Sequence, residues 1–313
     1  MKSPEGRLPR LQRPGQGVAR STVFFLATCM LGNAAAAEGV MLATRHSAAG
    51  DAASTVASPE VSGDGILRTR IAFAYARAPL RLLTELQLEH RVVRQQSWLH
   101  AGASYALAHR VLVYAELPLL LDQSGAPAPD LTATVARPAA SQALGDARLG
   151  TRVRIWSGYP YAWSVAGGAE MTLPSGDVDA YAGDEGLTGR AFAVVGAASS
   201  GLRWAVELGG FLRPSRTFPG VLPTRVGRSL TAAAVLQFPL DRGGRLWLGP
   251  ELVTSSAVSE GTRLFDARSS FGHLLLGARY RPFAGALQAT AAAGPGLGQA
   301  PGASDYQWIV ALG

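Results

Sequence analysis

Residues 145–177 read GDARLGTRVRIWSGYPYAWSVAGGAEMTLPSGD, and this stretch decides the fold class. From Asp146 to Trp156, charged or small residues alternate with apolar ones, which is typical of a β-strand with one polar and one apolar face. Residues 157–160 break the alternation, a second alternating run follows, and residues 174–177 end it. The stretch therefore predicts a β-hairpin whose charged side chains all lie on one face.

The same alternation recurs along the rest of the chain. Strands are predicted to begin near Leu67 and Val111, and further strands are predicted at about 92–107, 188–198, 202–213, 229–238, 245–255, 273–280, 286–294 and 305–312. Short turns near positions 108, 158, 200, 242 and 283 alternate with longer loops near 87, 133, 180, 220, 262 and 299. Together with the two strands of the hairpin at residues 145–177, the predicted strands number about twelve.

This alternation of connection lengths favours one architecture. An up-and-down outer-membrane β-barrel has an even number of antiparallel strands, short periplasmic turns and longer extracellular loops. Aromatic residues also gather near the short turns, as in an interfacial girdle: Tyr105, Trp156, Tyr161, Phe238, Tyr280 and Phe283. A secreted soluble β-sandwich, the alternative, explains the alternating faces but not the alternating loop lengths. The fold class predicted is therefore an all-β transmembrane barrel.

The N-terminal region predicts export to the outer membrane through the periplasm. Residues 1–37 have a basic start, a short apolar core and small residues before a cleavage site, which is typical of a signal peptide. Residues 38–64 are small and polar without periodicity, which predicts a flexible lead-in before a barrel over residues 65–313. Five basic residues before position 21 account for most of the net charge of +7. The chain therefore carries no basic patch of the kind that binds nucleic acid.

One hairpin motif resembles a known family. Gly145-Asp146-x-x-Leu149-Gly150, followed by Leu173-Pro174-Ser175-Gly176-Asp177, is similar to the hairpin of Gram-negative outer-membrane barrels of the phenol meta-pathway transporter type. It also resembles barrels that precede OmpA-like domains in myxobacteria. The resemblance implies a transport barrel over about residues 65–313. The sequence departs from this pattern because no OmpA-like sequence follows and the last residue is Gly313, so we expect a short gene or a missing C-terminal part.

The polar faces predict charges inside the barrel. The candidate lumen charges are Arg148, Arg152, Arg154, Glu170, Arg203, Glu207 and Arg279, with Arg70, Asp146, Arg213 and Glu251 on the same faces. They could form an arginine-rich constriction that favours anions, or a lattice of ion pairs that fills a narrow barrel. A three-residue turn after Ser157 would place Arg148 opposite Glu170. The acidic loop at 177–185 could bind a divalent cation, but its spacing lacks a calcium-loop pattern.

The sequence favours a protein that is not an enzyme and has no cofactor. His100 and Ser104 share a face but lie about 13 Å apart along a strand, and the H-x-S-N motif of outer-membrane lipases is absent. The expected partners are outer-membrane lipid, small solutes and the barrel assembly machinery. The leading hypothesis is a narrow passive channel or transporter for small anionic or hydrophobic solutes. The alternative is a structural or adhesive barrel with a plugged lumen.

Overall fold

The computed structural model describes residues 41–42, 45–61, 63–83, 89–127, 138–158, 163–218, 224–258, 264–266, 269–282 and 287–313. The strands are β1 (Ile66–Leu83), β2 (Glu89–Leu107), β3 (Val111–Gly125), β4 (Ala143–Leu144), β5 (Arg148–Ser157), β6 (Trp163–Thr172), β7 (Thr188–Ala198), β8 (Arg203–Leu212), β9 (Arg216–Phe218), β10 (Thr224–Val226), β11 (Ser229–Pro239), β12 (Leu246–Ala257), β13 (Ser270–Tyr280), β14 (Ala289–Gly298) and β15 (Tyr306–Leu312). In the described ranges, no helix is long and apolar enough to cross a membrane.

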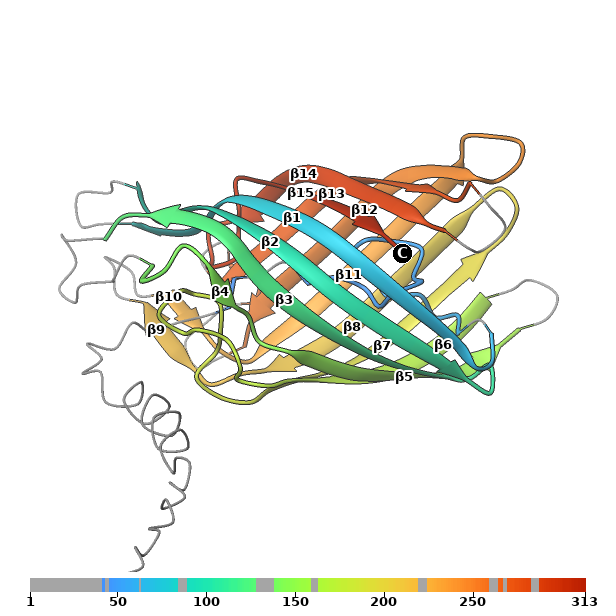
Figure 1. Cartoon of the computed structure of the whole chain (residues 1–313), viewed down its shortest axis with the longest axis horizontal. Helices are drawn as coiled ribbons and strands as arrows, with labels where there is room; N and C mark the ends of the chain where they lie inside the picture. The colour runs from blue at the N-terminus through green and yellow to red at the C-terminus, as the bar shows by residue number, and fades with distance from the viewer. Residues whose placement is uncertain are drawn as a thin grey trace, which may run out of the picture. The chain divides into compact units, whose positions relative to one another are not determined.

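Twelve of these strands close into one antiparallel barrel (Figure 1). Neighbours in sequence are neighbours in the sheet, and β1 closes the ring by pairing with β15 on one side and β2 on the other. The short strand β4 adds to the edge of β3, and β9 pairs with β10 as a separate hairpin. The prediction of an all-β, up-and-down barrel of about twelve strands is therefore confirmed. A closed ring leaves no unpaired sheet edge, which is what a bilayer requires of a β-structure.

The two faces of each strand differ as the alternation predicts. Exposed apolar side chains cover the outer face on strand after strand, for example Ile71, Val113, Ile155, Leu208 and Leu276. Among the aromatic residues expected near the short turns, the described ones are exposed there: Tyr105, Trp156, Phe238 and Tyr280. Tyr161 and Phe283 lie outside the described residues. Polar and charged side chains are instead buried on the inner face.

Backbone geometry marks two turning points of the chain. Ala108 and His109 both have positive φ, at 49° and 54°, and the Arg110 amide donates to the Leu107 carbonyl at 2.9 Å. Two successive positive φ values match the twist of a tight hairpin, so the predicted turn between β2 and β3 is confirmed. In β1 the pairing with β2 shifts between Arg77 and Leu80, next to Pro79. This irregularity is the bulge that a proline in a strand favours.

The motif of the family resemblance connects two loops at the long-loop end. The Asp146 carboxylate accepts the amides of Gly176 and Asp184, each at 2.7 Å, and Ser175 Oγ accepts the Ala147 amide at 2.9 Å. A Cβ on Gly176 would lie 2.8 Å from the Asp146 carboxylate, which explains the glycine. Burial raises the pKa of Asp146 while these amide bonds lower it. The motif thus serves loop structure at this end of the barrel.

Candidate functional site

Residues 45–61, which we call the plug, lie inside the barrel. Ahead of the plug, Leu42 packs in a cluster with Leu80 and Tyr181 at the long-loop end. At the other end, Val61 packs with Ala106 and Leu112 close to the short turn between β2 and β3. The plug therefore runs down the lumen from the long-loop end to the short-turn end, and β1 follows from there (Figure 1).

The burial of the plug differs from what its composition suggests. The sequence predicts a flexible lead-in over residues 38–64, whereas most described plug residues are buried against the barrel wall. Small side chains explain the fit: Ala53, Val56 and Ala57 pack in one cluster with Phe192 and Val194 of β7 and with alanines of β6, β8 and β11. A run of small residues has no amphipathic period of its own, so its burial could not be predicted without the barrel wall that it packs against.

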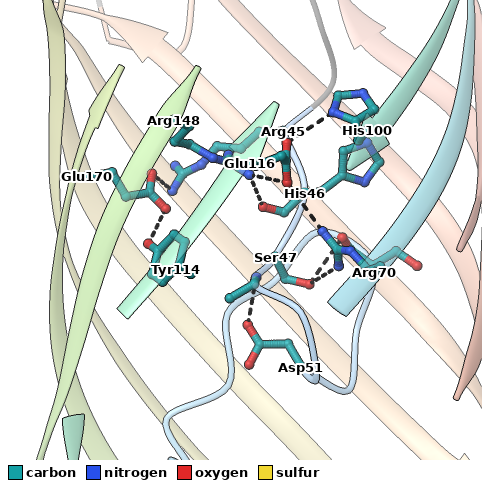
Figure 2. A network of polar contacts seen from close by, with 12 residues as sticks. Arg45, His46, Ser47, Asp51, Arg70, His100, Tyr114, Glu116, Arg148 and Glu170 are labelled. Carbon is teal, nitrogen blue, oxygen red and sulfur yellow. Dashed lines mark hydrogen bonds and ion pairs between the residues drawn. The ribbon is translucent and has the colours of Figure 1, made fainter. Parts of the chain in front are cut away.

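A charged cluster holds the upper part of the plug (Figure 2). Glu116 of β3 accepts Arg148 Nη2 at 2.7 Å and Arg70 Nη2 at 3.5 Å, and Arg45 of the plug pairs with Glu170 of β6. Arg148 Nη2 also donates to the backbone carbonyl of His46 at 2.8 Å. Arg148 and Glu170 of the wall therefore contact the plug directly. Glu116 pairs with Arg148 and with Arg70 and so connects these side chains.

Strand register corrects one expectation in this cluster. Arg148 pairs with Thr172, not with Glu170, which lies opposite Gly150. The connection between β5 and β6 is longer than a three-residue turn, and the pairing shifts between Arg154 and Trp156. Gly150 leaves room for the ring of Tyr114, whose hydroxyl donates to Glu170, because a Cβ there would lie 2.3 Å from that ring. Glu170 is thus bound by Tyr114 and by the plug.

His46 is buried in the same cluster without a polar partner for its ring. The His46 ring packs edge-on against the His100 ring, with centroids 4.1 Å apart, and both its nitrogens lack a hydrogen-bond partner among the described residues. His100 Nδ1 is bound to Glu116 at 3.0 Å. Burial lowers the pKa of His46 well below 6.5, and His100, Arg70 and Arg148 lower it further, against the opposing charge of Glu116. Burial therefore favours the neutral form of the His46 ring when the plug is in place.

The middle of the plug is held by a buried ion pair. Both carboxylate oxygens of Asp51 accept the guanidinium of Arg152, at 2.7 and 2.9 Å, and both side chains are almost fully buried. The Asp51 carbonyl also accepts Gln288 Nε2 at 2.6 Å. Two-point pairing of this kind fixes orientation as well as distance. Asp51 therefore anchors the plug at the centre of the lumen.

Two wall carboxylates bind the lower part of the plug through its backbone. Glu251 of β12 accepts the amides of Ser54 and Thr55, both at 3.1 Å, and the Thr55 hydroxyl at 2.8 Å. Glu207 of β8 accepts the Ala57 amide at 3.1 Å and pairs with Arg190 of β7. Residues 54–57 of the plug pair with no strand, so these carboxylates satisfy their backbone donors.

The predicted lumen charges divide into two groups. Arg148, Arg152, Glu170 and Glu207 all contact the plug or the ion pairs around it. Arg154, Arg203 and Arg279 instead lie toward the short turns, and none of the three forms an ion pair within 4 Å of a described acidic side chain. Arg203 stacks over Trp247 at 4.3 Å, and Arg279 Nε donates to Gln288 at 3.1 Å. The sequence analysis missed Arg45 and Asp51, because the lead-in offered no period from which to place them.

An open cavity of about 210 Å³ lies beside the plug toward the long-loop end, with Arg45 and Thr55 of the plug among its lining residues. We call it the vestibule. Its wall combines apolar and hydroxyl side chains with three arginines: Leu42, Phe211, Val226, Val253, Phe271, Ser229, Thr231, Thr254, Ser255, Arg45, Arg190 and Arg213. Each arginine has a carboxylate partner, Glu170, Glu207 and Asp184 in turn. The vestibule thus presents a mixed surface in which the cations are neutralised.

The acidic loop does not gather its carboxylates at one point. Asp177 Oδ1 accepts the amides of Asp179 and Ala180 in its own turn, at 3.0 and 3.2 Å. Asp184 is buried and pairs with Arg213 at 3.0 Å, and Glu185 pairs with Arg216. Among the residues that the structure describes, no group of three or more metal-binding side chains is found. The loop carboxylates therefore serve turn formation and ion pairs.

A comparison with solved structures finds outer-membrane proteins that are similar to this chain. An outer membrane channel from Pseudomonas putida F1 is 12% identical, with a TM-score of 0.57, covering 82% of this chain and 97% of the channel. The NanC porin is 7% identical, with a TM-score of 0.48 and coverage of 78% and 98%. The Pseudomonas putida toluene transporter TodX is 12% identical, with a TM-score of 0.40 and coverage of 88% and 97%. No family model and no curated protein sequence matches the chain.

At such low identity, the likeness to the first of these structures establishes the fold and leaves the solute open. The closed twelve-stranded ring, its apolar outer face and its charged lumen agree with that likeness. The chain therefore has the fold of an outer-membrane β-barrel channel.

Proposed function

We propose that this protein is an outer-membrane channel for small solutes that the plug closes in the present structure. The observation that carries the proposal is the plug itself, which is bound to the wall by Arg45, Asp51 and its own backbone amides rather than by an apolar core alone. Such polar contacts can be exchanged for water, so the plug can leave a lumen that remains hydrated. The barrel is the pore and the plug is its gate.

The vestibule supports passage of solutes with no net charge. Its three arginines, Arg45, Arg190 and Arg213, each pair with a carboxylate, so they give the vestibule little preference for an anion. Its volume of about 210 Å³ exceeds the ~150 Å³ of a cavity known to bind benzene, so a single-ring or similarly small solute fits. Apolar and hydroxyl groups together suit a small solute with both kinds of surface.

A second candidate is a structural barrel that stays plugged. The observation in its favour is the density of polar contacts at mid-lumen, where Glu116, Arg148 and Arg152 are all buried and paired. In that case the loops at the long-loop end would carry the function.

Conductance distinguishes the two candidates. Residues 38–313 and a variant lacking residues 41–61 would be refolded into planar bilayers, with heat-modifiable gel mobility as the check that each barrel has folded. We expect rare openings from the complete chain and steady, larger conductance from the variant without the plug, because its lumen fills with water and ions. A folded variant that stays silent without its plug would contradict the channel and favour the structural barrel.

A further inference from the structure

Charge is unbalanced at the short-turn end of the barrel. At mid-lumen five arginines face five carboxylates: Arg45, Arg70, Arg148, Arg152 and Arg190 with Asp51, Glu116, Glu170, Glu207 and Glu251. At the short-turn end the described residues include eight arginines and three acidic residues: Arg68, Arg110, Arg154, Arg203, Arg242, Arg245, Arg279 and Arg281 with Glu60, Asp64 and Asp241. The pKa of Arg281 is lowered by burial first, and then by the charges of Arg203 and Arg68.

Three buried donors in this region have no acceptor among the described residues. They are Arg203 Nε on β8, Gln237 Nε2 on β11 and Arg279 Nη1 on β13. Gln237 lies opposite Arg203, and Trp247 of β12, which lies opposite Arg279, contacts the Arg203 guanidinium with its ring. Buried donors in folded proteins almost always bind an acceptor, so this part of the lumen calls for one.

Two of these three residues, Arg203 and Gln237, line a cavity of about 50 Å³. Arg203 and Gln237 line it on the wall side, and plug residues 52–53 and 56–60 line the other side. One water needs about 10–15 Å³ of such volume, so the cavity can hold several waters or a group of four or five heavy atoms. The Arg203 guanidinium lies over the Trp247 ring, 4.3 Å from its centroid, so the ring covers one face of the guanidinium and an acceptor would bind at its edge.

We propose that this cavity is a binding site for a small oxyanion or carboxylate group, which we call the mouth site. A guanidinium edge and an amide N–H are the donors that phosphate and carboxylate oxygens accept. Arg203 supplies the charge, Gln237 supplies a neutral donor, and Arg279 adds positive potential from the neighbouring strands. Glu60 lines the same cavity and opposes binding, so the anion contacts the Arg203 side.

The mouth site exists only while the plug is seated, because plug residues form one of its walls. A ligand that binds only one of two states shifts the population toward that state. An anion in the mouth site therefore favours the closed form. This consequence rests on the proposed function as a gated channel, whereas binding itself does not.

Inorganic phosphate is the probe for the test. The line width of its ³¹P resonance would be followed while the chain of residues 38–313 is added in a detergent without phosphorus, at constant ionic strength. We expect broadening with the unaltered protein that chloride in excess of phosphate reduces only weakly. Arg203→Gln should lower the apparent affinity at least tenfold, and Glu60→Gln should raise it several-fold because a repelling charge is removed.

The matched control is Arg245→Gln, which removes the same charge from an exposed position at the same end. We expect it to bind phosphate like the unaltered protein. Gln237→Leu tests the neutral donor without a change in charge, and should also weaken binding. Equal loss in Arg245→Gln and Arg203→Gln would reduce the effect to general electrostatic attraction and overturn the site, as would unchanged binding in Glu60→Gln and Gln237→Leu together.

Single-channel recording separates the site from the proposed function. Phosphate on the short-turn side should lower the open probability of the unaltered channel and leave Arg203→Gln unaffected. Binding of phosphate by a barrel that never conducts would retain the mouth site and reject the channel. Conduction that phosphate leaves unchanged, in a protein that does not bind it, would retain the channel and reject the mouth site.

Discussion

The vestibule and the plugged part of the lumen lie in one barrel but are built differently. In the vestibule, hydroxyl and apolar side chains leave about 210 Å³ of space. In the plugged part, Asp51 meets Arg152, and Glu251 accepts the amides of Ser54 and Thr55. Both parts have the same alternation of inner and outer residues, so period alone does not distinguish them.

The difference teaches how a barrel of this size is closed. A buried charge is costly unless it is paired, so the arginines and carboxylates of the lower wall need partners. The plug supplies some of those partners and uses the wall to satisfy its own backbone. The vestibule is lined by some of the same residues, and its arginines Arg45 and Arg190 are already paired with Glu170 and Glu207.

The largest effect is expected from Asp51→Asn in the plug. It removes the negative charge beside Arg152 and leaves a buried guanidinium without its partner, which costs about 3–5 kcal/mol. Hydrogen–deuterium exchange of residues 45–61, followed by mass spectrometry, should then rise by two orders of magnitude or more while the strands stay protected. Normal protection of the plug in Asp51→Asn would show that the ion pair does not hold it.

Acid should release the plug through His46. The pKa of His46 is lowered while the plug is seated, whereas in the released plug it lies near 6.5. A proton therefore binds His46 of the released plug more tightly. The free energy that seats the plug is therefore complete above about pH 6.5 and falls as the pH drops below it, by at most about 1.4 kcal/mol per pH unit. Plug exchange, corrected for the intrinsic effect of pH, should increase between pH 7.5 and 5.

His46→Gln should remove most of this pH dependence, and His109→Gln is the matched control because His109 is exposed in the turn after β2. A pH response that persists in His46→Gln would assign the acid effect to other groups of the cluster.

The smallest effect is expected from Ser255→Ala in the vestibule wall. Ser255 lines the cavity, and its loss should change stability by less than about 0.5 kcal/mol and leave plug exchange unaltered. The same measurement on Asp51→Asn gives the contrast. A large rise of plug exchange in Ser255→Ala would show that vestibule and plug are energetically coupled and not separate parts.

The sequence by itself determined the barrel. A period of two on every strand, short turns alternating with long loops, and an even strand count specify an up-and-down ring before any contact is known. The inward faces of Arg148, Arg152 and Glu207 follow from the same period, because alternate residues of a strand lie on one side. The turn at Ala108 and the bulge near Pro79 were also local enough to predict.

Only the tertiary structure decided what those charges meet. Arg152 could have faced an open pore or a partner, and Asp51, which binds it, lies 101 residues away in a segment without periodicity. The position of Glu170 opposite Gly150 depended on where β5 and β6 join, which turn length alone did not settle. The period of a strand depends on residues that are neighbours in sequence, so the barrel wall could be predicted. An ion pair depends on residues that are close in space, so the position of the plug followed only from the fold.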